Sequence, residues 1–164
     1  ESSVTQHTPS YHWTRSTGGY ATMANTTPYT QSWESDSTWG NTVSISTAMD
    51  GTKTLNYSDA YGGLWIAPAA GKVTRASIVV RAHLVADDIT VKLWAVNPAD
   101  LVMTAIWSED ITMPNTSSIV TVNDDLSSSN SIAQGSLLLA TIEKQSNSGT
   151  SRYYFTWTIS GTYD

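Results

Sequence analysis

Towards its end the sequence reads Tyr153-Tyr154-Phe155-Thr156-Trp157-Thr158-Ile159-Ser160. The odd-numbered positions hold large apolar or aromatic residues, and three of the four even-numbered positions hold Ser or Thr. Successive side chains of a β-strand point to opposite faces, so this period of two is typical of a strand with one buried face. We therefore expect Phe155 and Trp157 to lie in a core and Tyr154 to lie on the opposite face.

The same alternation appears earlier in the chain. Between positions 76 and 84, small or aliphatic residues alternate with Ser, Arg and His, and the segment 89–95 repeats the pattern. Shorter strand-like runs lie at 64–66, 101–107, 118–123 and 136–144. Asp50-Gly51 provides a tight turn, which predicts a hairpin over 42–58. One segment differs, because Asn97-Pro98-Ala99-Asp100 resembles a helix start and predicts a short helix over 98–103.

The composition agrees with these strands. Of the 164 residues, 23 are Ser and 24 are Thr, and only 13% are charged. Thr, Val, Ile, Trp and Tyr favour a pleated, half-buried surface over a helix. Eight or nine short strands with turn signals between them are typical of a sandwich. The sequence predicts an all-β fold, an antiparallel β-sandwich of jelly-roll type formed by residues 41–164.

The segment 1–40 has a different character. It contains six Trp and Tyr residues among Ser, Thr, Gly and Asn, with almost no aliphatic residue and no period. Disordered tails usually lack aromatic residues, so these rings indicate a segment that packs on its own domain or on a neighbouring subunit. We expect residues 1–40 to form an extended N-terminal arm or a set of ordered loops.

Charge and cysteine content exclude several classes of protein. The formal net charge is −6, and clustered Lys and Arg for a nucleic-acid backbone are absent from the sequence. No apolar run reaches the ~20 residues of a membrane-spanning helix, and Glu1 to Gln6 lack the features of a signal peptide. Without Cys, disulfides and thiol nucleophiles are excluded. We expect neither a nucleic-acid nor a membrane partner.

The sequence contains no convincing catalytic or metal-binding pattern. His7, His12 and His83 show no metal-binding spacing, and no Gly-x-Ser-x-Gly elbow is present. Neighbouring carboxylates occur as Glu34 with Asp36, Asp87 with Asp88, Glu109 with Asp110, and Asp124 with Asp125. In turns such carboxylates cap the backbone, and a loop calcium site at Asp87/Asp88 or Asp124/Asp125 is the alternative. We expect no catalytic residue, no metal site and no cofactor.

Two segments carry a resemblance to a known class of proteins. These are the run from Gly62 to Val73, which reads GGLWIAPAAGKV, and the closing strand from Tyr154 to Asp164, with Gly135-Ser136-Leu137 between them. The pattern resembles the β-sandwich modules of virion structural proteins of tailed bacteriophages, especially cyanobacterial and marine phages, over about residues 61–164. The resemblance implies a jelly-roll-like domain on the outside of a virion, as a capsid decoration protein or part of a fibre, commonly trimeric.

Two functional hypotheses follow, and neither involves catalysis. In the first, the chain is a virion structural protein, assembled in the host cytoplasm, that contacts its own copies in a trimer and other virion proteins. Its candidate interface anchors are the arm residues Tyr11, Trp13, Trp33 and Trp39. In the alternative, the chain is a carbohydrate-binding module in which Trp94 and Tyr154 stack on a host-surface glycan.

Overall fold

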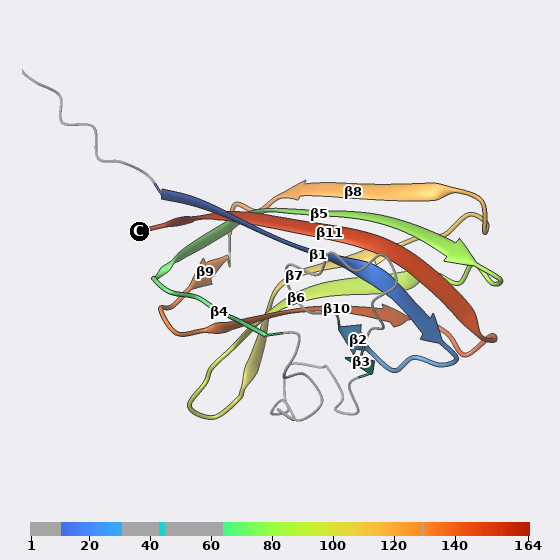
Figure 1. Cartoon of the computed structure of the whole chain (residues 1–164), viewed down its shortest axis with the longest axis horizontal. Coiled ribbons are helices and arrows are strands. Elements are labelled where there is room, and N and C mark those ends of the chain that lie inside the picture. The colour runs from blue at the N-terminus through green and yellow to red at the C-terminus, as the bar shows by residue number, and fades with distance from the viewer. Residues whose placement is uncertain (1–10, 31–42, 45–63, 129) are drawn as a thin grey trace, which may run out of the picture.

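The computed structural model describes residues 11–30, 43–44, 64–128 and 130–164. These residues form two antiparallel β-sheets that pack face to face, and no helix occurs among them (Figure 1). The predicted all-β fold with the architecture of an antiparallel β-sandwich is confirmed.

Each sheet is built around three long neighbouring strands. Sheet A contains, in spatial order, β1 (Tyr11–Met23), β11 (Ser151–Tyr163), β5 (Gly71–His83) and β8 (Ile119–Asp125), with β9 (Ser131–Ile132) also paired to β5. Sheet B contains, in spatial order, β3 (Val43–Ser44), β2 (Tyr29–Thr30), β10 (Leu137–Lys144), β6 (Ile89–Val96) and β7 (Met103–Ile111), with β4 (Trp65–Ile66) also paired to β10.

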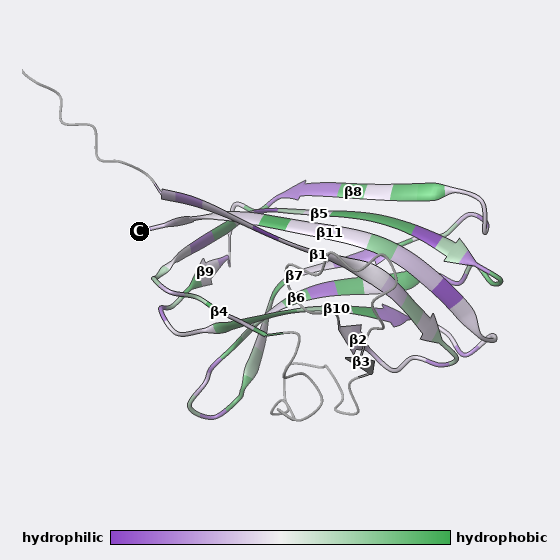
Figure 2. Ribbon diagram, viewed as in Figure 1, coloured by the Kyte–Doolittle hydropathy of each residue, from purple (hydrophilic) through white to green (hydrophobic). Residues whose placement is uncertain are grey.

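The strand β11 provides a large part of the core. Tyr153, Phe155, Trp157 and Ile159 are all buried, as the alternation predicts. The ring of Trp157 crosses the sandwich to meet Trp107 of β7, with centroids 5.6 Å apart and planes at 70°. Figure 2 shows that hydrophobic residues also run along the neighbouring β5. Edge-to-face aromatic contacts of this kind contribute about 0.5–1.5 kcal/mol beyond the area that they bury.

The structure differs from the expected N-terminal arm in residues 11–23. This segment is β1, which pairs with β11 over its full length of 13 residues. Its inward positions are unlike those of an ordinary core strand, because Thr17 lies opposite Trp157 and Gly19 lies opposite Phe155. These small residues leave room for the large rings of β11, so the strand lacks the apolar period that sequence analysis requires.

The helix predicted over 98–103 is wrong. The segment is the loop of the β6–β7 hairpin, in which the Leu101 N–H donates to the Asn97 carbonyl oxygen and the Asn97 N–H donates to the Val102 carbonyl oxygen. The Asn97 side chain does accept the Ala99 N–H, as a helix cap would. However, Leu101 has a φ of 58°, and this left-handed conformation ends the turn after one cycle.

The hairpin predicted over 42–58 lies mostly outside the described residues. Within it, Val43–Ser44 forms β3, which pairs with β2. The predicted strands at 89–95, 118–123 and 136–144 are confirmed as β6, β8 and β10.

A buried ion pair joins the loops at one end of the sandwich. Lys144, at the end of β10, is completely buried, and its Nζ lies 2.7 Å from Oδ2 of Asp87 in the β5–β6 loop. Lys144 also donates to the Gly149 carbonyl oxygen, and Ser148 donates to Asp87. Despite the opposing effect of burial, the hydrogen bonds and charge of Lys144 lower the pKa of Asp87.

Candidate ligand-binding surface

The outer face of sheet A carries the residues that alternate with the core positions of its long strands. The strand register places one residue from each strand in a row across this face: Tyr20 of β1, Tyr154 of β11, Arg81 of β5 and Ile119 of β8. Arg152 precedes Tyr154 by two positions, so it lies on the same face of β11. We refer to Tyr20, Tyr154, Arg81 and Arg152 as the tyrosine–arginine patch.

The side chains of this patch contact one another. The rings of Tyr20 and Tyr154 lie 6.1 Å apart with planes at 47°. The Arg152 guanidinium lies 5.2 Å from the centre of the Tyr20 ring, and its Nε donates to Oγ1 of Thr22 at 3.3 Å. Hydrogen bonding with the Tyr154 side chain raises the pKa of Arg152 above its already high ordinary value. Arg152 therefore remains a fixed cation beside two aromatic rings.

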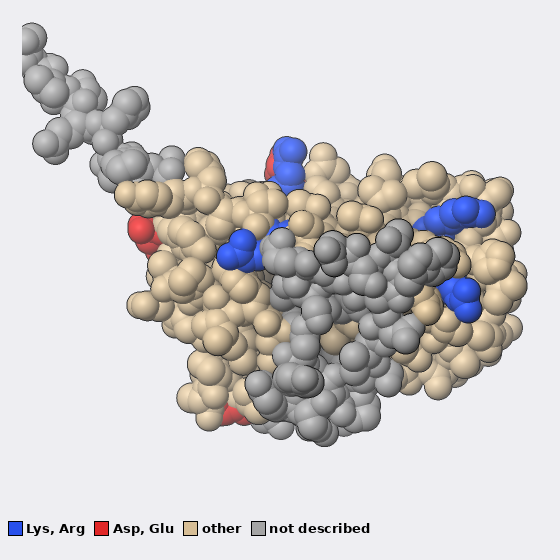
Figure 3. Space-filling view, in the orientation of Figure 1, with Lys and Arg blue, Asp and Glu red and all other residues tan. Residues whose placement is uncertain are grey.

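The patch is positively charged on a chain that is acidic overall. The ion pairs within the described ranges are Arg75 with Asp125, Lys92 with Glu143, and Lys144 with Asp87, and none of them includes Arg81 or Arg152. On the face that Figure 3 displays, basic side chains without acidic neighbours gather at the end of the molecule where β5 ends and β11 begins. The patch thus has uncompensated charge.

The remainder of the face is rich in hydroxyl groups. Ser77 donates to Oδ1 of Asn123 at 2.6 Å, and the hydroxyls of Thr14 and Ser160 are 3.4 Å apart. In this part of the face, outside the patch, the charge of Arg75 is neutralised, because its guanidinium lies 2.8 Å from Oδ1 of Asp125. The contact between aromatic rings and a guanidinium group is therefore a feature of the patch and not of this part of the face.

The two predicted stacking residues have different positions. Tyr154 lies on the outer face of sheet A, where it is partly exposed. The prediction for Trp94 is wrong, because its side chain is only 2% exposed and its Nε1 donates to Oγ1 of Thr141 at 3.0 Å. Trp94 belongs to a second apolar cluster with Val96, Met103, Leu137 and Leu139. The alternation placed Trp94 opposite the main core correctly, but that second face is covered as well.

The candidate interface residues also differ in their exposure to solvent. Tyr11 is 62% exposed at the start of β1. Trp13 is only 6% exposed, and its ring packs 5.1 Å from Trp65 and 6.2 Å from Tyr163. Trp13 is thus a core residue of its own chain and not an exposed anchor. Trp33 and Trp39 lie outside the described residues.

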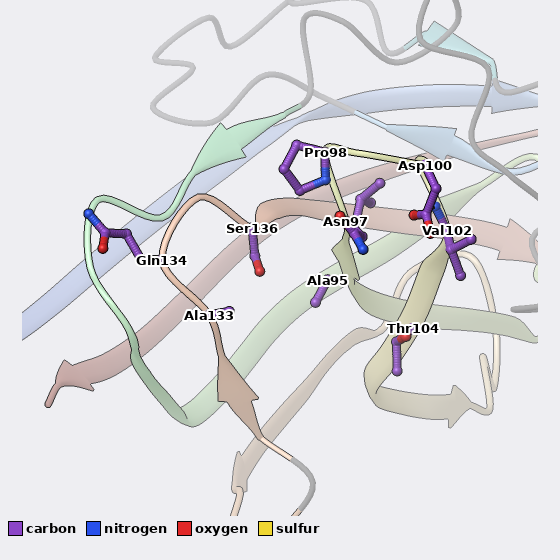
Figure 4. A pocket seen from close by; sticks show the side chains of 10 residues that line it. Ala95, Asn97, Pro98, Asp100, Val102, Thr104, Ala133, Gln134 and Ser136 are labelled. Carbon is purple, nitrogen blue, oxygen red and sulfur yellow. The ribbon is translucent and has the colours of Figure 1, made fainter.

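A shallow pocket of about 430 Å³ lies beside the β6–β7 hairpin loop (Figure 4). It is lined by Ala95, Val96, Asn97, Pro98, Asp100, Val102, Thr104, Ala133, Gln134 and Ser136. Its one carboxylate, Asp100, accepts the Val102 N–H and shapes the loop. The pocket therefore offers small and polar side chains without the paired titratable groups that acid–base chemistry requires.

The neighbouring carboxylates serve structural roles where the structure describes them. Asp88 accepts the Met113 N–H at 2.9 Å, and Asp110 accepts the Thr90 hydroxyl at 2.7 Å. Asp124 accepts the Trp107 Nε1–H at 3.0 Å. Glu34 and Asp36 lie outside the described ranges.

One pairing of carboxylates was not predicted. Burial, together with the charges of Asp124 and Asp110, raises the pKa of Glu109, so Glu109 and Asp124 are electrostatic neighbours although they belong to different sheets. Within the described ranges, no group of three or more His, Cys, Asp or Glu residues could hold a metal ion. In the same part of the chain, no helix is long and apolar enough to cross a membrane.

Comparisons with known proteins add little to this description. No protein family and no curated protein matches the sequence. Among solved structures, the crystal structure of tripeptidyl peptidase 2 is similar, with 16% sequence identity and a TM-score of 0.34. The match covers 58% of this chain and 8% of the peptidase. The fold thus defines the class, an antiparallel β-sandwich, and the function must be argued from the site.

The alternation in the sequence predicted the outward position of Tyr154 but not the residues around it. Arg152 precedes Tyr154 by two positions, so the spacing of the two residues already placed them on one face of β11. Tyr20 and Arg81 could not be found in this way, because they belong to strands whose pairing with β11 is visible only in the tertiary structure.

Proposed function

We propose that this chain is a non-enzymatic binding module that recognises a glycan through the tyrosine–arginine patch. The observation that carries the proposal is the contact between Tyr20 and Tyr154 on an outer sheet face, with Arg152 held beside them by Thr22. Aromatic rings with a polar group are well suited to ligands that have one apolar face and a polar rim.

A sugar ring is such a ligand. Its C–H groups pack against an aromatic ring, and its hydroxyl groups accept hydrogen bonds from guanidinium groups and exchange hydrogen bonds with hydroxyl side chains. Tyr154 supplies the aromatic ring. Hydrogen-bonding groups around it come from Arg152 and Thr156 of β11 and from Arg81 of β5. All of these residues lie on paired strands, so little backbone conformational entropy is lost when a ligand binds.

The direct test is calorimetric titration of the full chain with a panel of soluble polysaccharides. We expect Tyr154→Ala to weaken binding at least tenfold, since aromatic stacking is lost. Thr158→Ala is the matched control, because Thr158 lies on the same strand and the same face but outside the patch. If the two variants bind equally well, or if no polysaccharide binds to the full chain, the proposal is wrong.

A second candidate is a structural role on the exterior of a tailed-bacteriophage particle, as a decoration or fibre protein. The observation that favours protein contacts is β8, which forms one edge of sheet A within the described strands. Its first residue, Ile119, is 67% exposed, and Figure 2 shows this end of β8 to be hydrophobic. Edge strands with exposed β-branched residues pair readily with other chains. The partners would be copies of the chain, in a trimer, or other virion proteins.

Light scattering over a dilution series tests this second candidate. We expect an assembly larger than a monomer that Ile119→Lys dissociates, because a charged residue on an edge strand opposes pairing. Val102→Lys is the control, since Val102 is also exposed but lies in the β6–β7 hairpin. A monomer at all concentrations, or equal effects of both substitutions, would exclude self-assembly through β8.

A further inference from the structure

The two arginines of the patch differ from the third arginine on the same face. Arg75 makes a direct ion pair with Asp125, with Nε and Nη2 both close to the carboxylate oxygen Oδ1. Arg81 instead donates from Nε to the Thr116 carbonyl oxygen at 3.4 Å, and Arg152 donates to a hydroxyl. Arg81 and Arg152 thus have neutral hydrogen-bond partners and retain donor groups for an anion.

The two guanidinium groups lie on different sides of Tyr154. Arg152 extends towards β1, where it lies over the Tyr20 ring. Arg81 is the cross-strand neighbour of Tyr154 on β5, and its side chain reaches the loop before β8. A ligand centred on the Tyr154 ring would therefore have a cation on the β1 side and another on the β8 side.

We infer that the glycan recognised by the patch is an acidic polysaccharide, whose carboxylates bind Arg152 and Arg81 while a sugar ring between them stacks on Tyr154. This inference rests on the proposed function. Guanidinium groups bind carboxylates through two parallel hydrogen bonds, which a neutral sugar cannot accept with the same strength. A polymer supplies several carboxylates along one chain, as two separated cations require.

The overall charge of the chain makes this arrangement specific. A formal net charge of −6 disfavours the approach of a polyanion to the chain as a whole, so attraction depends on places where cations such as Arg81 and Arg152 have no ion-pair partner. Binding should consequently weaken with salt, because ionic screening acts on exposed charges. A neutral glycan bound by stacking alone would show little dependence on salt.

The experiment compares polygalacturonate with the same polymer after its carboxyl groups have been reduced to alcohols. We expect the full chain to bind polygalacturonate at least tenfold more tightly than the reduced polymer at low salt. The affinity for polygalacturonate should fall when the salt concentration is raised. Arg81→Gln and Arg152→Gln should each weaken binding to polygalacturonate at least fivefold and weaken binding to the reduced polymer by a clearly smaller factor. Arg75→Gln is the matched control and should leave both affinities unchanged. Thermal melting of each variant confirms that it is folded.

The outcomes separate the inference from the proposed function. Equal binding of the two polymers, with loss of both in Tyr154→Ala, would overturn the acidic ligand but support a glycan site. Preference for polygalacturonate that depends equally on Arg75, Arg81 and Arg152 would also overturn the inference, because the attraction would then be diffuse. If neither polymer binds to the full chain, and no other polysaccharide in the panel binds either, both proposals are wrong.

Discussion

Lys144 and Asp87 form an ion pair of 2.7 Å at a site where the lysine side chain has no exposure to solvent. Removing one partner of a buried ion pair leaves an uncompensated charge, which typically costs about 3–5 kcal/mol. The pair joins the end of β10 to the β5–β6 loop, and the Tyr153 hydroxyl donates to the Asp87 carbonyl oxygen in the same region. It therefore connects both sheets.

We predict that Lys144→Met lowers the free energy of unfolding by about 3 kcal/mol or more, since Asp87 loses its cation. Urea denaturation followed by tryptophan fluorescence measures the change. Lys92→Met is the control, because Lys92 pairs with Glu143 at a partly exposed site and a pair of that kind contributes about 0–1 kcal/mol. Similar losses in the two variants would contradict the assigned role of Lys144.

Glu109 provides a prediction of pH dependence. Burial and the charges of Asp124 and Asp110 raise its pKa above 4.5 in the folded protein, so the ionised form is disfavoured there. A raised folded pKa means that Glu109 destabilises the fold as pH rises through that value. We predict that Glu109→Gln is more stable than the parent chain at pH 7 and that this gain disappears below pH 4.

Denaturation midpoints at the two pH values test this prediction. Glu143→Gln is the control, since Glu143 faces Lys92 at 3.0 Å and its removal should bring no gain at pH 7. A gain from Glu109→Gln that is as large in acid as at neutral pH would show that charge is not its cause.

Trp94 should affect stability and not ligand binding. Its side chain is buried in a cluster that includes Leu139 and Met103, and truncation of a buried Trp costs about 3–5 kcal/mol. We predict that Trp94→Phe, a milder change, lowers the melting temperature and leaves glycan affinity within twofold. A folded Trp94→Phe variant that loses glycan binding would move the binding surface to sheet B.

Gly161 has a packing role in β11. An added Cβ at this position would overlap the Lys72 carbonyl oxygen and the ring of Trp13. We predict that Gly161→Ala destabilises the protein by about 1–3 kcal/mol, as overpacking of a core does. Gly18→Ala is the comparison, because its closest contact would be 3.1 Å and the position lies on the outer face. Thermal unfolding of the two variants should rank Gly161→Ala as the less stable.

Sequence patterns determined the strands whose inward positions are regularly apolar. In β11 and β5 the hydrophobic effect acts on every second residue, so the period of two and the buried face could be predicted locally. The period of two did not reveal β1, because its inward Thr17 and Gly19 are small residues that lie opposite the large rings of β11. Such complementarity is a property of the pair and not of either segment.

The sequence alone thus determined the class of fold and the outward position of Tyr154, and the spacing of two also puts Arg152 on that face, although Arg152 was not predicted as a site residue. Only the tertiary structure decided that Tyr20 and Arg81 complete the patch, since strand register brings both residues beside Tyr154 from distant parts of the sequence. It also decided that Trp94 is buried, because alternation indicates which face a residue occupies but not whether that face is covered. Local periodicity indicates which residues of one strand share a face, whereas a binding surface depends on which strands become neighbours.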